Sequence, residues 1–259
     1  MHQREGERLG MRYTYALIDF DLHGLPDSTL PEVLAAAERA GFAGFNVTHP
    51  FKQAIIAALS DLAPEALAIG AVNTVVLRDG RRVGHNTDCW GFAESFRQSM
   101  AGCALRGAVQ FGAGGGGAAV AHALLELGLG ALDIVDSDDG KAEKLADRLS
   151  RRFGRAVVAV ASPEAALRRA DGIINATPVG MSKYPGTPLP LNELRSRHWV
   201  ADIVYFPAET ELLRCAREIG CRTLAGAGMA VFQAVRAFEL FTGIAPDREA
   251  MTRHFEAAA

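Results

Sequence analysis

The stretch that decides the fold is AVQFGAGGGGAAVAHALLELG, Ala108–Gly128. A short apolar run leads into five glycines within six residues, and an Ala-rich run long enough for a helix follows. Gly112, Gly114 and Gly117 satisfy the pattern G-x-G-x-x-G. That pattern is weak by itself, but it is specific when a strand precedes it and a helix follows it inside a βαβ unit. The stretch therefore predicts the start of a parallel, doubly wound sheet.

Each glycine of this stretch has a predicted physical role. The first allows a tight turn, the second lets backbone N–H groups approach a pyrophosphate, and the third permits close packing of helix and strand. The helix N-terminus then faces the phosphates. We therefore expect a dinucleotide to bind here, and the alternative is a flexible turn without a ligand. The candidate binding residues are Gly112, Gly114, Gly115, Gly116 and Gly117.

The next strand, LDIVD, ends at Asp136, where an acidic residue would accept a hydrogen bond from the adenosine ribose 2′-OH. A carboxylate there repels a 2′-phosphate, and three acidic residues precede Lys141. The pattern favours NAD as the cofactor, with NADP possible. The alternative is a solvated or helix-capping acid, since Ser137, Asp138 and Asp139 are all plausible caps.

Strand-like and helix-like runs alternate along the rest of the chain, which is typical of an α/β fold. Before residue 101 they comprise the strand-like YTYALIDF, a helix in LPEVLAAAERAG, the strand GFNVT, a helix beginning in PFKQAIIAAL and a helix beginning in DCWGFAESFRQSM. A hairpin is predicted around Asp79-Gly80, a strong two-residue turn signal. Two further helices are expected in residues 228–243 and 246–258, able to pack on either unit.

Composition excludes several classes of protein. The chain has 259 residues and a net charge of −3, without a run of like charges, so we expect no nucleic-acid partner. No apolar helix candidate approaches the ~20 residues of a membrane span. The cysteines form no C-x-x-C pair or metal-ligand spacing, which indicates reduced thiols of a cytoplasmic protein without a metal or a disulfide. They are Cys89, Cys103, Cys215 and Cys221.

Two ionisable residues at predicted loop ends are candidates for proton chemistry. Lys52 follows the strand GFNVT, and Asp88 follows the hairpin at the start of a helix. An alcohol that loses hydride must also lose a proton, and a Lys beside a carboxylate can manage that proton and stabilise a developing alkoxide. The plainer alternatives are a solvated Lys in a first helical turn and an N-capping Asp.

Seven motifs in order resemble the shikimate dehydrogenase family over nearly the whole chain. The resemblance implies a Rossmann-type dinucleotide domain, residues 101–228, and a smaller α/β substrate domain, residues 1–100 with the helices of 229–259 packed back on it. A cleft would lie between them. It also implies reversible oxidation of the ring 3-hydroxyl of shikimate or quinate. The motifs are NVTHPFK, GAVNTVV, GHNTDCWGF, GAGGGGAAVA, NATPVGM, ADIVYFPAETELL and GMAVFQAVRAFELFTG.

The resemblance also implies residue roles. Lys52 and Asp88 would form the catalytic pair. Lys52 would act either as a base or as an electrostatic clamp. Several of the others have plainer explanations in turn formation, hydrogen bonding at the edge of the core, or packing. The ring hydroxyls would be held by Thr48, Asn73, Tyr205 and Gln233, nicotinamide would lie near Val204, Gly228 and Met229, and the loop Asn175–Met181, with Asn175 and Thr177, would line the cofactor.

Within the family, His49 before a proline and the acidic Asp136 are similar to the NAD-using quinate/shikimate dehydrogenases, which favours a catabolic or dual-substrate role. Family members generally carry a Ser-x-Ser-Pro or Ser-x-Thr-Pro carboxylate anchor before Met-His, and Asp-Gly where this chain has Ala225-Gly226. Two alternatives therefore stay open: an enzyme for an amino- or otherwise modified analogue, and a non-catalytic dinucleotide-binding relative. The expected state is a monomer or homodimer.

Overall fold

The computed structural model describes residues 1–257, which form two compact units. The first comprises Met1–Thr87 and the chain from Val231 onward, and the second comprises Asp88–Ala230. The divisions fall inside helices α5 (Thr87–Ser99) and α10 (Gly226–Thr242), and the domain bounds at residues 100 and 228 expected from the sequence stay a prediction. Each of these two helices therefore contains residues of both units.

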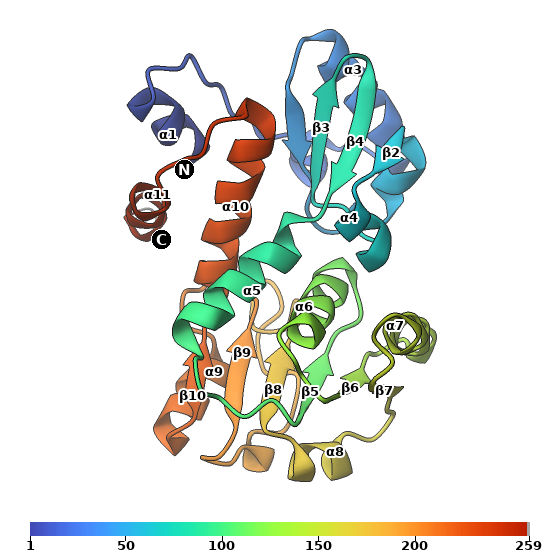
Figure 1. Cartoon of the computed structure of the whole chain (residues 1–259), viewed down its shortest axis with the longest axis vertical. Coiled ribbons are helices and arrows are strands. Elements are labelled where there is room, and N and C mark those ends of the chain that lie inside the picture. Colours follow the sequence, from blue (N-terminus) through green and yellow to red (C-terminus); the bar gives the residue numbers. More distant parts are fainter. Residues whose placement is uncertain (258–259) are drawn as a thin grey trace. The chain divides into compact units, whose positions relative to one another are not determined.

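The second unit contains a six-stranded sheet in the order β10-β9-β8-β5-β6-β7, with parallel pairing throughout. The strand order reverses between β5 and β8, as in a doubly wound fold, and the prediction of that architecture is confirmed. Figure 1 labels these strands. Their bounds are β5 (Gly107–Phe111), β6 (Ala131–Val135), β7 (Ala156–Ala159), β8 (Gly172–Asn175), β9 (Trp199–Asp202) and β10 (Arg222–Leu224).

The buried strands and the capped helices of this unit follow from their sequences. All four residues of β8 and of β9 are buried, as expected of central parallel strands. Asp138 caps α7 and Thr210 caps α9 by accepting hydrogen bonds from backbone N–H groups. The connecting helices are α6 (Gly115–Glu126), α7 (Asp139–Phe153), α8 (Glu164–Arg169) and α9 (Glu211–Ile219), with a 3₁₀ turn at Leu191–Glu193.

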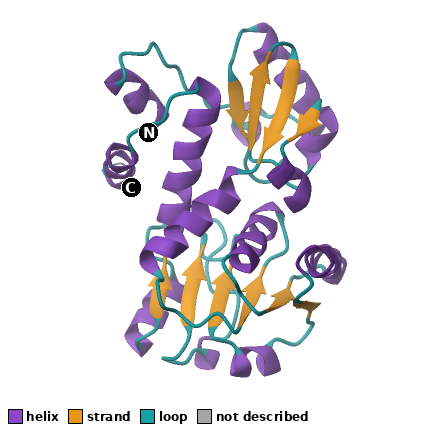
Figure 2. Ribbon diagram, viewed as in Figure 1, coloured by secondary structure: helices purple, strands orange, loops and turns teal. Residues whose placement is uncertain are grey.

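The first unit contains a separate four-stranded sheet in the order β1-β3-β4-β2 (Figure 2). Strands β3 and β4 form the predicted hairpin, and Asp79 and Gly80 both adopt positive φ, 53° and 69°, as its two-residue turn requires. Leu34, Val72 and Val75 are core residues. The strands are β1 (Gly44–Asn46), β2 (Asp61–Leu62), β3 (Thr74–Arg78) and β4 (Arg81–His85).

The helices of the first unit include both ends of the described chain. The C-terminal helix α11 contacts the N-terminal helix α1, and the Asp247 N–H donates to Glu5 Oε1 at 2.8 Å (Figure 1). The last helix therefore packs on α1 within the first unit. The helices are α1 (His2–Arg8), α2 (Phe20–His23), α3 (Leu30–Arg39), α4 (Pro64–Ile69), α11 (Arg248–Glu256) and 3₁₀ turns at Asp27–Thr29 and Ala54–Ala58.

Two predicted elements of the first unit are wrong. YTYALIDF, residues 13–20, does not form a strand, since no neighbouring strand pairs with it, and Leu17 is 83% exposed. High β-propensity makes a strand only where a partner completes the ladder. PFKQAIIAAL forms a turn followed by the 3₁₀ helix Ala54–Ala58 instead of an α-helix.

Candidate functional site

The loops after β5, β6, β8 and β9 leave the same edge of the six-stranded sheet, because its strands are parallel. In open α/β sheets, ligands bind outside this carboxyl edge where the strand order reverses. That point lies between β5 and β8. There the Ala176 N–H donates to the Phe111 carbonyl at 2.7 Å, and a Cβ on Gly112 would lie 2.5 Å from the Ala176 carbonyl oxygen. The two loops are in contact, and a side chain at residue 112 is excluded.

The Gly-rich turn has the geometry predicted for it. Gly112 has a φ of +103°, and a Cβ on Gly117 would lie 2.2 Å from the Gly112 carbonyl oxygen. A Cβ on Gly114 would meet no atom within 4 Å, so the backbone there borders open space. Gly114 is the N-cap of α6, and no side chain caps this helix, whose first residues are Gly115 and Gly116. Its first N–H groups therefore fit a phosphate.

Gln110 braces this turn and is not among the predicted site residues. Its side chain is fully buried, and its Nε2 donates to the carbonyls of Gly112 at 2.8 Å and of Gly117 at 3.0 Å. Both ends of the turn are thereby tied to strand β5. A polar residue in the middle of the apolar run AVQF is the sequence signal that points to this role.

Asp136 contacts the Gly-rich turn from the neighbouring strand. The Ala113 N–H donates to Asp136 Oδ2 at 2.7 Å, and the Asp138 N–H donates to Asp136 Oδ1 at 3.0 Å. The cap of α7 is Asp138, which accepts a hydrogen bond from the Lys141 N–H. The capping alternative therefore describes Asp138 and not Asp136. The Ser137 hydroxyl also donates to Asp136 Oδ1 at 3.5 Å. Since a carboxylate accepts about four hydrogen bonds, Asp136 Oδ2 retains acceptor capacity for a ribose hydroxyl.

The loop after β8 is ordered by Asn175 and Thr177. Asn175 is fully buried, and its Oδ1 accepts from Thr177 N–H at 3.0 Å and Thr177 Oγ1 at 2.7 Å. Thr177 Oγ1 in turn accepts from the Val179 N–H at 3.1 Å. Both side chains therefore hold the shape of the loop, so their predicted contribution to cofactor binding lies in positioning its backbone.

The loop after β9 and the start of α10 contain the remaining cofactor candidates. Val204 is buried, and Tyr205 in the same loop is 53% exposed. A Cβ on Gly228 would lie 2.1 Å from Ser95 Oγ, so this glycine lets α10 pack directly on α5. Met229 is 7% exposed and packs as a core residue. Packing accounts for Gly228 and Met229, and their placement near nicotinamide stays a prediction.

A buried cluster of neutral polar side chains lies in the first unit. The Thr87 N–H donates to Asn73 Oδ1 at 2.7 Å, and Asn73 Nδ2 lies 2.9 Å from Thr87 Oγ1 and 3.5 Å from Gln233 Oε1. The structure thus brings together Asn73 and Gln233, two predicted substrate residues that are 160 positions apart. Sequence reasoning missed Thr87 as a member of this cluster, although it lies inside the motif GHNTDCWGF.

The cluster continues through Thr74 to Asn46 and Tyr15. Thr74 is fully buried, its Oγ1 accepts from Asn46 Nδ2 at 3.2 Å, and the Tyr15 hydroxyl donates to Asn46 Oδ1 at 3.0 Å. None of these three residues was singled out from the sequence. Asn46 and Thr74 lie in the quoted motifs NVTHPFK and GAVNTVV, and polar residues within buried strands were the available signal.

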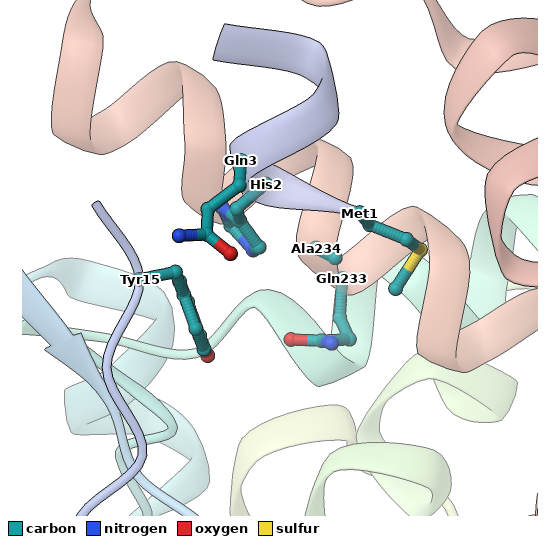
Figure 3. Close-up of a pocket in the computed structure, with 6 residues that line it drawn as sticks. All are labelled: Met1, His2, Gln3, Tyr15, Gln233 and Ala234. Atoms are coloured by element: carbon teal, nitrogen blue, oxygen red, sulfur yellow. The ribbon is translucent and has the colours of Figure 1, made fainter. Parts of the chain in front are cut away.

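Gln233 also lines a cavity of about 190 Å³ in the first unit (Figure 3). Its other walls come from α1 and from the extended segment that contains Tyr15. His2 stacks on Tyr15 with ring centroids 4.8 Å apart, and burial lowers the pKa of His2 to about 4. His2 is therefore uncharged at neutral pH, and Gln3, Tyr15 and Gln233 add neutral polar groups to the lining. Its lining residues are Met1, His2, Gln3, Tyr15, Gln233 and Ala234.

The two proton-handling candidates have different local settings. Lys52 lies in the turn after β1 and is half-buried, and its carbonyl accepts from the Val72 N–H at 2.7 Å. Asp88 is 4% exposed and is the second residue of α5, so it lies inside the first turn and is not the N-cap. Thr48 is exposed, and its carbonyl accepts from the Phe51 N–H. The catalytic and binding roles of these residues stay predictions.

The described residues, 1–257, contain neither a candidate metal site nor a candidate membrane span. No group of three or more His, Cys, Asp or Glu side chains in that range is arranged to hold a metal ion. None of its helices combines the length and the apolar character needed to cross a bilayer.

Two family models match parts of the chain, and known proteins resemble it over nearly its whole length. The model of the shikimate dehydrogenase substrate binding domain matches residues 1–75, and that of the shikimate 5′-dehydrogenase C-terminal domain matches residues 226–254. Shikimate dehydrogenase (NADP⁺) of Streptomyces avermitilis is 54% identical over 95% of this chain and 86% of its own length. Quinate/shikimate dehydrogenase (NAD⁺) of Corynebacterium efficiens is 44% identical over 98% of this chain and 91% of its own.

A solved structure is also similar to this chain. Quinate dehydrogenase from Corynebacterium glutamicum, in complex with NAD, superposes with a TM-score of 0.91. The two chains are 43% identical, and the match covers 99% of this chain and 92% of the other.

Proposed function

The chain belongs to the shikimate dehydrogenase family, and from that premise we propose that it catalyses the reversible oxidation of the ring 3-hydroxyl of shikimate or quinate, with NAD preferred over NADP. Both cofactors occur in the names of its relatives, so the preference rests on this chain's own residues. The enzyme class, an NAD(P)-dependent shikimate/quinate dehydrogenase, is common to these relatives.

The observation that carries the cofactor preference is the position of Asp136. Its carboxylate contacts the Gly-rich turn through the Ala113 N–H and lies at the end of the strand next to β5. The residues that follow it are Ser137, Asp138 and Asp139. A 2′-phosphate near this segment would meet negative charge, whereas ribose hydroxyls would find acceptors. This arrangement supports NAD.

The residues of the Gly-rich turn and α6 would hold the pyrophosphate, and Asp136 would hold the adenosine ribose. When bound, the nicotinamide supplies the acceptor for the hydride that leaves the carbinol carbon. The proton of the same hydroxyl needs a separate acceptor. We assign that role to the pair Lys52 and Asp88: a neutral Lys52 amine would accept the proton, and the Asp88 carboxylate would stabilise the ammonium that forms.

The neutral polar cluster of the first unit supports a polyol substrate. Asn73 and Gln233 present amide groups, which donate and accept, to the uncharged hydroxyls of a ring. Thr48 and Tyr205 are proposed as further partners for hydroxyls. Several fixed polar groups are what a small polar ligand requires for orientation.

The first experiment is the initial rate of nicotinamide reduction with purified protein, with NAD and NADP each tested against quinate and shikimate. We expect the highest rate with NAD, and the preferred acid identifies the substrate. Turnover with NADP alone would contradict the cofactor assignment. An absence of turnover in all four reactions would contradict the activity and favour a modified ring acid or a non-catalytic role.

Substitution of Lys52 tests the proton-handling role. We expect Lys52→Ala to lower kcat by roughly 10²–10⁴-fold, the range of general acid–base catalysis, while the Kd for NAD stays unchanged. Lys144→Ala, on the exposed side of α7, is the matched control and should keep full activity. A Lys52→Ala protein with most of its activity would remove Lys52 from the mechanism.

A further inference from the structure

Asp202 lies at the end of β9 with its carboxylate buried and without a cationic partner among its hydrogen-bond donors. The residue is 1% exposed. Its Oδ1 accepts from Asn175 Nδ2 at 3.0 Å and from the Val204 N–H at 3.0 Å, and its Oδ2 accepts from Thr210 Oγ1 at 2.7 Å. Burial raises the pKa of this carboxyl above its ordinary value, while the three hydrogen bonds oppose that shift. Removing a carboxylate from water costs free energy, so a buried aspartate without a cationic partner suggests a specific role for this side chain.

The three donors come from two segments at the carboxyl edge of the sheet. Asn175 is the last residue of β8, from which the next loop departs, whereas Val204 and Thr210 lie in the loop after β9, Thr210 as the N-cap of α9. The Thr210 hydroxyl also accepts from the Leu213 N–H at 3.3 Å. Asp202 therefore joins two loops and the start of one helix through a single side chain.

The two loops also approach each other closely at a second point. A Cβ on Gly180 would lie 3.3 Å from Thr210 Cγ2, and Gly180 has a φ of +106°. Asn175 Nδ2, besides its bond to Asp202, donates to the Val179 carbonyl at 2.8 Å. The bonds from Asp202 and Asn175 thus set the path of the first loop up to the place where it meets the second.

We propose that Asp202 is a positioning residue that holds the loops after β8 and β9 in the arrangement that the dinucleotide requires. The proposal rests on the proposed function, because Asn175, Thr177 and Val204 are cofactor residues only if a dinucleotide binds at this edge. Asp202 acts through these residues and need not touch the cofactor. Asp202 would keep the site in its binding-competent arrangement before the ligand arrives. If only a fraction of the molecules hold that arrangement, the apparent affinity is reduced by the same fraction.

The test compares Asp202→Ala with Asp171→Ala, since both residues are buried aspartates in the same unit. Asp171 lies at the opposite, amino edge, beside the start of β8, and bonds to Arg106. We expect Asp202→Ala to raise the Kd for NAD about 10- to 100-fold, because the loops are no longer pre-organised. Isothermal titration calorimetry measures this Kd. The control should keep the Kd of the parent protein although it loses stability.

A second readout requires no cofactor. In ligand-free protein, amide hydrogen exchange should accelerate at Thr177, Val179 and Val204 in Asp202→Ala and stay unchanged there in Asp171→Ala. Asp202→Asn keeps an oxygen for Asn175 and Val204 but loses the acceptor for Thr210, so it should give an intermediate effect. That variant carries the test if the alanine variant does not fold.

Two outcomes would overturn the proposal. One is an Asp202→Ala protein whose loops exchange as slowly as in the parent, and the other is an equal loss of NAD affinity in the Asp171 control. Failure of the proposed function looks different: parent protein that binds NAD but turns over neither acid contradicts the activity, while loop exchange in Asp202→Ala still decides the role of this residue.

Discussion

The two edges of the six-stranded sheet each bury an aspartate, and the two carboxylates are satisfied in opposite ways. At the amino edge, Asp171 accepts hydrogen bonds from the backbone N–H, Nε and Nη2 of Arg106, and the guanidinium lowers the pKa of its carboxyl. At the carboxyl edge, the donors to Asp202 are all neutral, and burial raises its pKa. Asp171, whose charge is balanced by Arg106, joins the starts of two strands, whereas Asp202, which has only neutral donors, joins the loops that follow the strands.

The amino edge and the Gly-rich turn also differ in whether their positively polarised groups already have partners. A hollow of about 140 Å³ at the amino edge is lined by Arg106 and Arg169 among others. Each of these arginines pairs with a carboxylate, Arg106 with Asp171 and Arg169 with Asp133. The Gly-rich turn has no side-chain cap on its helix. The physical difference is that backbone donors at the carboxyl edge remain available to an anion, whereas the cations at the amino edge are already compensated.

The largest effect that sharpens this comparison should come from two glycines on either side of β5, Gly117 in the first turn of α6 and Gly107 at the start of the strand. In Gly117→Ala the new Cβ would lie 2.2 Å from the Gly112 carbonyl oxygen, so the turn must shift. We expect the Kd for NAD to rise by more than about 100-fold, because the phosphate site is built from this backbone. In the control Gly107→Ala, the Cβ meets Ala131 at 3.8 Å and binding should be unchanged. Calorimetric titration of both variants decides, and unchanged binding in Gly117→Ala would contradict the assignment.

A smaller effect is expected from the opposite pKa shifts of the two aspartates. Asp171 has a pKa below its ordinary 3.8, so its contribution to stability is complete above pH 3.8 and is lost as the pH falls through the folded-state value. Asp171→Asn should therefore cost about 2 kcal/mol at neutral pH, the scale of a charge-assisted hydrogen bond. That cost should shrink in acid. Urea unfolding at a series of pH values measures it.

Asp202 should show the reverse dependence. Because its folded-state pKa is raised above 3.8, its ionisation lowers stability as the pH rises from 3.8 through the folded-state value. The stability of Asp202→Asn relative to the parent protein should therefore increase with pH over that window. The same urea series tests this prediction, and parallel curves for the two aspartate variants would remove the distinction between the two edges.

The effect of Asp136 on cofactor choice should be smaller again. Asp136→Ala should lower the ratio of kcat/KM for NAD to that for NADP by about tenfold, the equivalent of one hydrogen bond to a charged group. Overall NAD affinity should also fall, because Ala113 loses its partner. Asp147→Ala is the matched control, since it removes an exposed carboxylate from the middle of α7. An unchanged ratio in Asp136→Ala would reduce Asp136 to a structural role.

The smallest effect should come from Arg169 at the amino edge. Arg169 Nη2 lies 2.7 Å from Asp133 Oδ2, and the arginine side chain is 60% exposed. Arg169→Ala should change the free energy of unfolding by no more than about 1 kcal/mol, as for most exposed ion pairs, and leave NAD binding unaltered. Weakened NAD binding in this variant would mean that the amino edge contributes to the site after all.

Local patterns predicted the parts of the fold whose signals lie within one segment. The Asp79-Gly80 turn, the strand–glycine–helix order around Gly112 and the acidic residue at Asp136 each express a constraint that acts over a few residues. The strand at residues 13–20 was wrong because strand formation depends on a distant partner. Gln110, Thr74 and Asp202 were missed for the same reason, since their hydrogen-bond partners come from other loops and strands.

The amino-acid sequence by itself determined the doubly wound sheet, the glycine turn and the family, because these depend on local backbone requirements and on the order of motifs. Only the tertiary structure decided which polar residues cooperate. It placed Asn73 beside Gln233 and gave Asp202 donors from two loops. The physical reason is that a buried polar group must find partners wherever the packed chain supplies them, and sequence spacing does not contain that information.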